Sequence, residues 1–227
     1  MKHMNTWKQN AANKKSIVSY SGGKDSTLAL EWAMKQGEVI GLLVMMEEQG
    51  ERSRSHATGS ELVRAQAKAI GLPVFEVSAS WTTYEEAFVE ALKAAKEAGA
   101  EVLVTGDIDL LEHGLWHEQV AARAGLQLAM PLWQEERKSI VKEVVERGYR
   151  AIIVTINESL GMKASDLGRE LSIEFMNELI ERGIDPCGEQ GEFHTTVIDG
   201  PCFQQALDVK FGRVVRQDPY VFLELTL

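Results

Sequence analysis

Residues 16–26 read Ser-Ile-Val-Ser-Tyr-Ser-Gly-Gly-Lys-Asp-Ser, and this stretch decides the fold. The apolar run Ser16–Tyr20 predicts a buried strand, and the pattern over Ser26–Gln36 predicts a helix directly after the loop. The two glycines between them let the backbone turn tightly and approach a ligand. Because a helix N-terminus offers free N–H groups, the order strand, loop, helix predicts an anion site.

The side chains of this loop suit a phosphate chain. Ser21 and Ser26 add hydroxyl donors, and Lys24 adds a full positive charge. The loop is not a Walker A motif, which needs a Ser or Thr directly after the lysine, where Asp25 stands. A carboxylate beside phosphates is typical of a magnesium ligand, so Asp25 is a candidate for one. A serine–glycine turn that only caps a helix is the disfavoured alternative.

Composition limits the class of protein. The chain has 227 residues, 44% of them hydrophobic, which is enough for one sizeable core. Its net charge of −10 argues against a broad nucleic-acid surface, since such surfaces need Lys and Arg. The apolar runs are too short to span a bilayer, and residues 1–15 predict a disordered tail without a signal peptide. We therefore expect a cytoplasmic protein, in which Cys187 and Cys202 are reduced thiols.

Strand and helix patterns alternate through the first 183 residues. Apolar runs predict parallel strands covered on both faces at 16–20, 39–46, 74–77, 101–105, 126–129 and 151–156. Helical patterns lie at 26–36, 60–70, 85–98, 135–147 and 167–182. This alternation predicts an α/β fold with a doubly wound, mainly parallel sheet.

The pattern changes after Gly183. A turn-rich stretch is followed by short strands expected at 193–198, 206–211, 213–217 and 221–227, which predict a small antiparallel sheet. We expect three parts: the tail at 1–15, a nucleotide-binding domain at 16–183, and a smaller C-terminal segment at 184–227.

A second motif lies in that segment, at Cys187-Gly188-Glu189-Gln190-Gly191-Glu192-Phe193-His194-Thr195. Glu189 and Glu192, three apart in a glycine-rich turn, could hold a metal, receive an ammonium ion or act as a general base. Thr195 could donate to an anion. A polar turn leading into a hairpin stays open as the alternative.

The first motif resembles the PP-loop signature of the ATP-pyrophosphatases, enzymes that cleave ATP between its α and β phosphates. Together with the second motif, it resembles the diphthine–ammonia ligase family, which pairs the loop with a Gly-Glu-x-Gly-Glu-x-x-Thr segment. Further similar stretches are His56 with Glu61-Leu62-Val63, Gly106-Asp107-Ile108 and Pro131-Leu132-Trp133. The Phe193-His194-Thr195 form looks like a bacterial branch of that family.

This resemblance implies an ATP-dependent amide ligase that adenylates a carboxylate, releases AMP and pyrophosphate, and transfers free ammonia. The implied catalytic residues are Lys24, Asp25, Glu189 and Glu192. The implied ATP contacts are Ser21, Gly22, Gly23, Lys24, Ser26, Met45 and Gly106. The implied acceptor-side residues are Gly188, Gly191, His194, Thr195 and His56. Mg²⁺ is expected at Asp25 and Asp107.

Two alternatives for the function stay open. A tRNA-modifying PP-loop enzyme would need a basic surface or an added RNA-binding domain. A sensor that holds ATP or AMP without turnover would have no use for Glu189 and Glu192. A zinc site at His113 and His117, four residues apart, is disfavoured relative to a pocket edge. A homodimer and the identity of the acceptor are not decided by the sequence.

Overall fold

The computed structural model describes Trp7, residues 11–50 and residues 59–227. The contacts divide these residues into two compact units. The first falls within residues 1–21, 25–55 and 72–135, and the second within residues 22–24, 56–71 and 136–227. The grouping therefore changes at Glu135, and the stretch from there to Gly183 belongs with the C-terminal strands.

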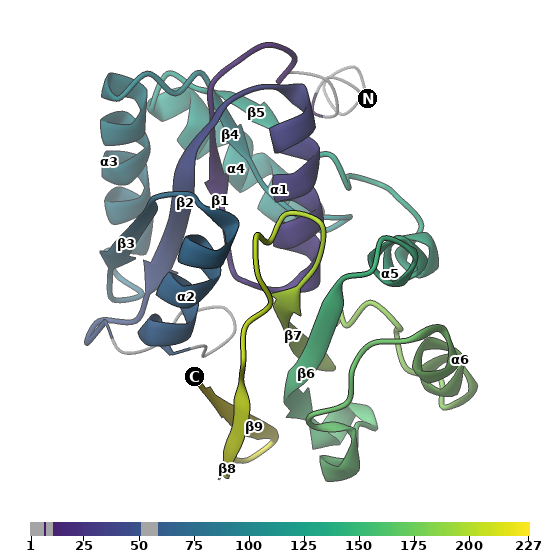
Figure 1. The fold of residues 1–227 in the computed structure, drawn as a ribbon. Helices are drawn as coiled ribbons and strands as arrows, with labels where there is room; N and C mark the ends of the chain where they lie inside the picture. The colour runs from purple at the N-terminus through teal and green to yellow at the C-terminus, as the bar shows by residue number, and fades with distance from the viewer. Residues whose placement is uncertain (1–6, 8–10, 51–58) are drawn as a thin grey trace. The chain divides into compact units, whose positions relative to one another are not determined.

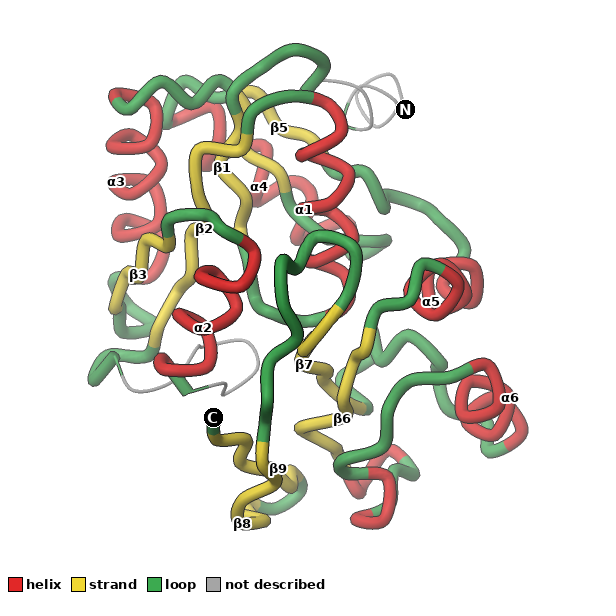
Figure 2. The backbone as a smooth tube through the Cα atoms, in the orientation of Figure 1, coloured by secondary structure: helices red, strands yellow, loops and turns green. Residues whose placement is uncertain are grey.

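The first unit is built on a parallel sheet of five strands (Figures 1 and 2), in the order β3-β2-β1-β4-β5. The strands are β1 (Ser16–Ser19), β2 (Val39–Met46), β3 (Val74–Ser78), β4 (Val102–Val104) and β5 (Gln127–Ala129). Strand order reverses between β1 and β4, as a doubly wound sheet requires. The predicted α/β class is confirmed.

Three helices belong to this unit: α1 (Lys24–Gln36), α3 (Tyr84–Glu97) and α4 (Leu111–Arg123). Right-handed crossovers in this strand order place α3 and α4 together, on the face opposite α1. Helix α4 was not among the predicted helices, although His113 and His117 were expected near the start of a helix. A Cβ at Gly114 would lie 2.8 Å from the Trp133 ring, so the glycine permits close packing there.

Trp7 contradicts the expectation of a frayed tail at its position. Its ring meets Trp133 edge-on at 5.0 Å between centroids, and its carbonyl accepts the Met130 N–H at 2.8 Å. Trp7 is 3% exposed and belongs to the apolar core of the first unit. The rest of the predicted tail up to residue 10 lies outside the described residues.

The second unit is built on an antiparallel sheet in the order β7-β6-β9-β8. Its strands are β6 (Arg150–Asn157), β7 (Phe193–Asp199), β8 (Lys210–Gln217) and β9 (Tyr220–Thr226). The helices of this unit are α2 (Ser60–Ile70), α5 (Arg137–Glu146) and α6 (Ile173–Glu181), with two short 3-10 turns, η1 (Glu158–Leu160) and η2 (Ala164–Asp166). The predicted antiparallel C-terminal sheet is confirmed.

Three predictions for this unit were wrong in detail. The run 151–156 was expected in the parallel sheet, but β6 pairs antiparallel with β7 and β9. The apolar sequence of β6 correctly indicates that the strand is buried, and Leu62 and Ala69 of α2 pack in the same core cluster. Burial alone does not show whether a strand pairs parallel or antiparallel, so the sequence could not predict the direction of pairing. The strands expected at 206–211 and 213–217 are the single strand β8. Helix α6 begins at Ile173, after the Ser172 side chain caps it, rather than at Leu167.

A membrane-spanning helix is absent from the described ranges: none of their helices combines the needed length with the needed apolarity.

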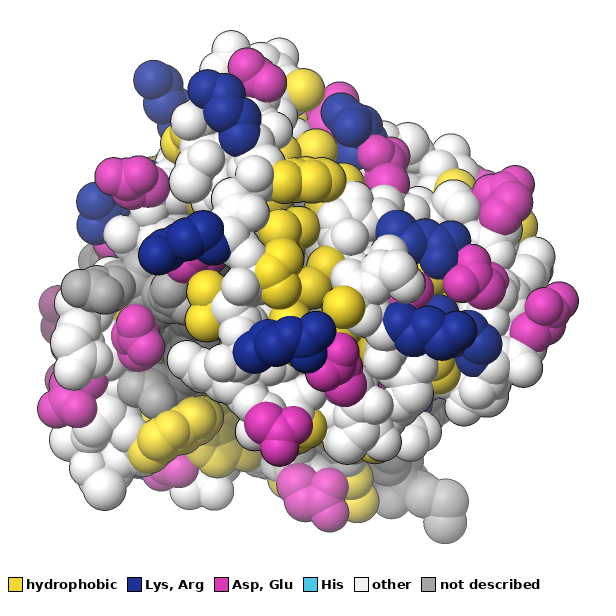
Figure 3. All heavy atoms as spheres, turned by 90° about the horizontal axis from the view of Figure 1, so that it is seen from below, with side chains coloured by type: hydrophobic (Ala, Val, Ile, Leu, Met, Phe, Trp, Pro, Cys, Tyr) yellow, Lys and Arg dark blue, Asp and Glu magenta, His cyan; other side chains and the backbone are white. Residues whose placement is uncertain are grey.

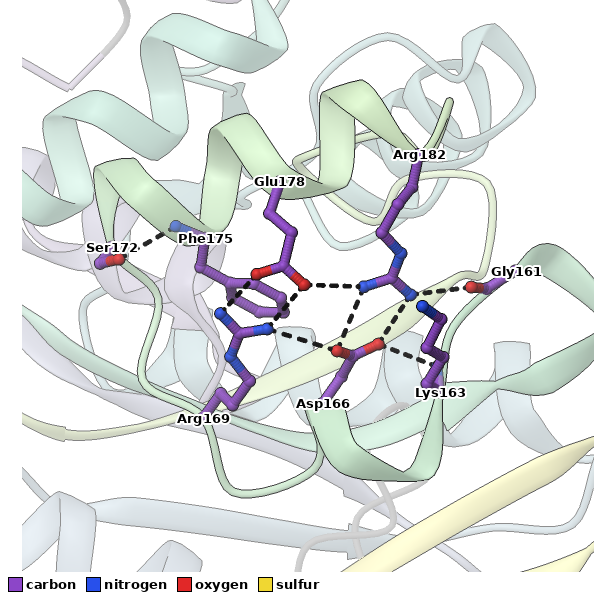
Figure 4. Close-up of polar contacts among 8 residues, drawn as sticks. All are labelled: Gly161, Lys163, Asp166, Arg169, Ser172, Phe175, Glu178 and Arg182. Carbon is purple, nitrogen blue, oxygen red and sulfur yellow. Dashed lines mark hydrogen bonds and ion pairs between the residues drawn. The ribbon is translucent and has the colours of Figure 1, made fainter.

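A network of charged side chains fixes α6 to the η2 turn (Figure 4). The buried Asp166 carboxylate accepts the Arg182 guanidinium at 2.8 and 3.2 Å. Arg169 pairs with Glu178 at 2.7 Å and lies 3.8 Å above the Phe175 ring. Burial alone would raise the pKa of Asp166, but the Arg182 hydrogen bond and the neighbouring charges lower it overall. The ionised carboxylate is therefore a stabilising element of this unit.

We expect Asp166→Asn to lower the free energy of unfolding by about 2 kcal/mol at pH 6, because Arg182 loses a charged partner. The folded-state pKa of Asp166 lies below its ordinary value of 3.8, so its contribution is present above that pH. The contribution is lost as pH falls through the folded-state pKa. Denaturant unfolding from pH 6 to pH 2 should show the wild-type advantage shrink below about pH 4.

The matched control is Arg213→Gln, which breaks an ion pair whose arginine is 84% exposed. It should change stability by less than about 0.5 kcal/mol. An Asp166→Asn effect no larger than this control would contradict the stabilising role.

Candidate active site

The first half of the glycine-rich loop belongs to the parallel sheet. Strand β1 ends at Ser19 and α1 begins at Lys24, slightly earlier than the predicted bounds at Tyr20 and Ser26. The Ser21 N–H donates to Ser26 Oγ at 3.2 Å, and the two hydroxyls lie 3.0 Å apart. The predicted hydroxyl donors Ser21 and Ser26 thus lie together at the start of the helix.

Close backbone packing requires a glycine at position 106. It follows β4, and a Cβ there would lie 2.7 Å from the Asp25 carbonyl carbon and 2.8 Å from the Ser26 nitrogen. Only glycine lets the end of β4 approach the first turn of α1 this closely. Its predicted contact with the nucleotide stays a prediction.

The second half of the loop, Gly22–Lys24, groups with the antiparallel sheet. The Gly22 carbonyl accepts the Val197 N–H at 2.9 Å and the Gln66 side-chain amide at 3.0 Å. The same amide nitrogen donates to the Val197 carbonyl at 2.7 Å. Gly22 has a φ of +81°, and a Cβ would lie 2.5 Å from Gln66 Oε1. Gln66 therefore fixes the loop to β7 at a position that only glycine fits.

Lys24 joins the two sequence motifs. Its backbone N–H donates to Thr195 Oγ1 at 3.1 Å, and its ammonium donates to the Cys187 carbonyl at 2.5 Å. The ammonium also lies 5.7 Å from the centroid of the Phe193 ring. Lys24 is only 4% exposed. The loop lysine and the C-terminal motif therefore occupy one place in the second unit, although 163 residues separate Lys24 from Cys187.

The turn that carries the second motif is held by a carboxylate outside it. Asp185 accepts the Cys187 N–H at 3.0 Å and the Glu189 N–H at 3.1 Å, and it pairs with Arg137 at 2.5 Å. Gly188 has a φ of +75°, and a Cβ there would lie 2.7 Å from the Phe193 carbonyl oxygen. The glycine of the motif is thus required by close backbone packing.

Glu192 closes this turn. Its carboxylate accepts the Gln190 N–H at 2.9 Å, across Gly191, which has a φ of +88°. Its carbonyl accepts the Asn157 N–H at 2.8 Å, which attaches the motif to the end of β6. Glu192 is 5% exposed, so it is an acidic group on the inner side of the turn.

His194 follows the turn on β7. Burial, and then the charge of Lys24, lower its pKa from 6.5 to about 4. The imidazole is therefore neutral at neutral pH, where it can donate or accept a hydrogen bond but carries no charge.

Asp107 is held by two histidines of α4. Its carboxylate oxygens lie 3.3 Å from His113 Nδ1 and 3.0 Å from His117 Nε2. Burial alone would raise the pKa of Asp107, but the charge and hydrogen bonds of His117 and His113 outweigh it and hold the pKa far below its usual range. Asp107 is therefore ionised at neutral pH, with its oxygens already engaged.

Comparisons with known proteins identify the family. Residues 14–128 match the diphthamide synthase N-terminal domain, and residues 136–223 match the diphthamide synthase C-terminal domain. The chain belongs to the diphthamide synthase family. The boundary between the two family domains falls close to Glu135, where the contacts of the chain also change.

Relatives of this diphthamide synthase family member are named diphthine–ammonia ligase. The Schizosaccharomyces pombe protein is 26% identical over 219 residues, covering 86% of this chain and 36% of that protein. The Mus musculus protein is 26% identical over 229 residues, covering 89% of this chain and 85% of that protein. The chain thus spans about a third of the fission yeast relative and most of the mouse one.

Two solved structures are similar only at a distance. One, titled a predicted subunit of tRNA methyltransferase from Methanocaldococcus jannaschii, aligns with a TM-score of 0.47 at 17% identity, covering 83% of this chain and 98% of that one. The other, a 4-thiouridine synthetase in complex with RNA and ATP, aligns with a TM-score of 0.41 at 18% identity, covering 60% of this chain and 41% of that one. The family assignment does not depend on them.

The remaining predicted residues have different surroundings. Met45 is 6% exposed within the apolar core of the first unit, so its predicted contact with the nucleotide stays a prediction. His56 lies outside the described residues. Asp25 is half-buried in the first turn of α1, and its carboxylate is the ligand type that Mg²⁺ prefers. At Asp107 a metal would compete with two histidines.

The sequence did not single out Gln66, Asp185 or Arg137. A polar residue among the buried apolar positions of α2 is the signal that could have found Gln66. An Asp before Pro in a turn is the signal that could have found Asp185. Nothing in the sequence pairs Arg137 with it.

We expect Gln66→Glu to lower the affinity for Mg-ATP about tenfold, because a carboxylate oxygen would face the Gly22 and Val197 carbonyls. Isothermal titration with Mg-ATP measures this. The control is Gln204→Glu, the same substitution at an exposed glutamine that lies 3.4 Å from the Ile70 carbonyl. Wild-type affinity in folded Gln66→Glu protein would show that this amide does not shape the loop.

Proposed function

We propose that this chain is an ATP-dependent ligase that joins ammonia to a carboxylate and forms AMP and pyrophosphate. The observation that carries the proposal is the contact of Lys24 with the second motif, through Thr195 and the Cys187 carbonyl. The lysine of a phosphate-binding loop thus lies beside a turn that carries two carboxylates. This arrangement supports a site in which ATP and the acceptor bind next to each other.

In the proposed first step, an acceptor carboxylate oxygen attacks the α phosphorus of ATP. The bond from that phosphorus to the bridging oxygen breaks, and pyrophosphate leaves with the electron pair. Lys24 and the N–H groups of Gly22 and Gly23 offset the charge that develops on the departing group. Mg²⁺, when bound at Asp25, would supply further neutralisation of the phosphates.

In the proposed second step, the nitrogen of ammonia attacks the acyl carbon and AMP leaves with the bonding electrons. Glu189 and Glu192 are the groups proposed to hold the incoming ammonium and take its protons. His194, neutral at this pH, is proposed as a hydrogen-bond partner for the acceptor. Free ammonia is the proposed nitrogen source, since both cysteines, Cys187 and Cys202, are buried rather than presented as nucleophiles.

A tRNA acceptor is less well supported. The net charge is −10. On the face drawn in Figure 3, the described basic and acidic side chains are interspersed among hydrophobic and uncharged ones. Such a face lacks the continuous positive field that a nucleic-acid backbone requires.

The test is to measure AMP and pyrophosphate from ATP with a panel of carboxylic acids, with and without ammonium. We expect at least one acid to support ammonium-dependent formation of AMP. Tight ATP binding with no AMP from any acceptor would contradict the ligase proposal and favour a nucleotide sensor.

Lys24→Ala should lower AMP formation at least about 100-fold, because the developing pyrophosphate loses its cation. Single-turnover assays at saturating ATP measure the chemical step. Lys93→Ala, which removes an exposed lysine that pairs with Glu90, is the control and should retain full activity. A folded Lys24→Ala protein with near wild-type rates would remove Lys24 from the mechanism.

Glu192→Gln should leave the affinity for Mg-ATP within about twofold, because an amide oxygen can still accept the Gln190 N–H. The ammonium-dependent rate should fall about 100-fold, because the buried group no longer accepts a proton. Loss of ATP binding instead would show that this side of the turn serves the nucleotide.

A further inference from the structure

A partly buried ion pair lies outside both sequence motifs, and one of its members holds the residue whose carbonyl contacts the loop lysine. The Asp185 side chain is 7% exposed and that of Arg137 is 24% exposed, and their atoms meet at 2.5 Å. Asp185 lies in the turn after α6, and Arg137 is the first residue of α5, 48 positions away in the chain. The pair therefore ties the start of one helix to the turn that carries the second motif.

The position of Arg137 is not one that helix stability would favour. The first turn of α5 contains no acidic residue and begins with Arg137 and Lys138. Positive charges at a helix N-terminus oppose the helix dipole. The arginine is therefore better explained by what it contacts, Asp185, than by any benefit to its own helix.

The Asp185 carboxylate also holds the backbone of the turn through two hydrogen bonds. One carboxylate oxygen accepts the Cys187 N–H, and the other accepts the Glu189 N–H. The oxygen on Glu189 is also the one that pairs with Arg137. Both amide groups are thus fixed by one side chain whose orientation the guanidinium sets.

The fixed turn presents a carbonyl to the loop lysine. Cys187, whose N–H Asp185 holds, accepts the Lys24 ammonium on its carbonyl oxygen at 2.5 Å. A buried ammonium needs such acceptors, because an unpaired one would bear the full cost of desolvation. The contacts therefore run without a break from Arg137 through Asp185 and Cys187 to Lys24.

We infer that Asp185 and Arg137 are positioning residues, which set the Lys24 ammonium for the phosphates of ATP by fixing the Cys187 carbonyl. They need not touch the nucleotide themselves. This inference rests on the proposed function, in which Lys24 binds those phosphates.

The test is isothermal titration of the full chain with Mg-ATP. We expect Asp185→Asn and Arg137→Gln each to lower the affinity about tenfold, which is the usual size of one charge-assisted hydrogen bond. The double variant should fall no further than either single variant, because both changes break the same series of contacts. Arg137→Lys keeps the charge and should give an affinity between those of wild type and Arg137→Gln.

Arg169→Gln is the matched control. It removes an arginine of the same unit that pairs with Glu178, outside the second motif. Thermal unfolding should show that it destabilises the protein as the Arg137 variants do, while its affinity for Mg-ATP stays at the wild-type value.

Equal affinities for wild type, Arg137→Lys and Arg137→Gln, with unfolding temperatures lowered as in Arg169→Gln, would overturn the inference and leave a purely structural ion pair. A wild-type chain that binds no Mg-ATP would overturn the proposed function together with the inference. The Arg137→Lys variant keeps the test decisive if the larger changes prevent folding.

Discussion

The burial of one ammonium group constrains the second unit more than any other interaction. Lys24 is 4% exposed; its backbone N–H donates to the Thr195 hydroxyl, and its ammonium donates to the Cys187 carbonyl. A buried cation is costly unless polar groups surround it, so the turn that supplies the carbonyl must hold its shape. The left-handed glycine at position 188 and the Asp185 carboxylate follow from this requirement.

The same requirement links the loop to the antiparallel sheet. The Val197 N–H donates to the Gly22 carbonyl, and the Gln66 side-chain amide on α2 donates to the carbonyls of both residues. A phosphate loop attached in this way keeps its N–H groups oriented before a ligand arrives, which lowers the cost of binding. An anionic ligand would in turn supply the counter-charge that a buried lysine favours.

Much of this could be predicted from the sequence where local signals are strong. The glycines and the lysine after a buried strand predicted the loop between β1 and α1. The bounds of β2 and α2 also agree with those predicted from the apolar pattern. The pairing of β6 and the burial of Trp7 could not be predicted, because each depends on a partner distant in the chain. For the same reason Gln66 and Asp185 escaped notice, while the roles of Glu189, Glu192 and Asp25 stay predictions.

The most direct test of the central claim is a crystal structure of the chain with AMP and pyrophosphate bound. We expect phosphate oxygens within hydrogen-bonding distance of the N–H groups of Gly22 and Gly23 and of the Lys24 ammonium. We also expect the turn from Cys187 to Thr195 beside them. A nucleotide whose phosphates lie away from Lys24, with the lysine still on the Cys187 carbonyl, would contradict this claim.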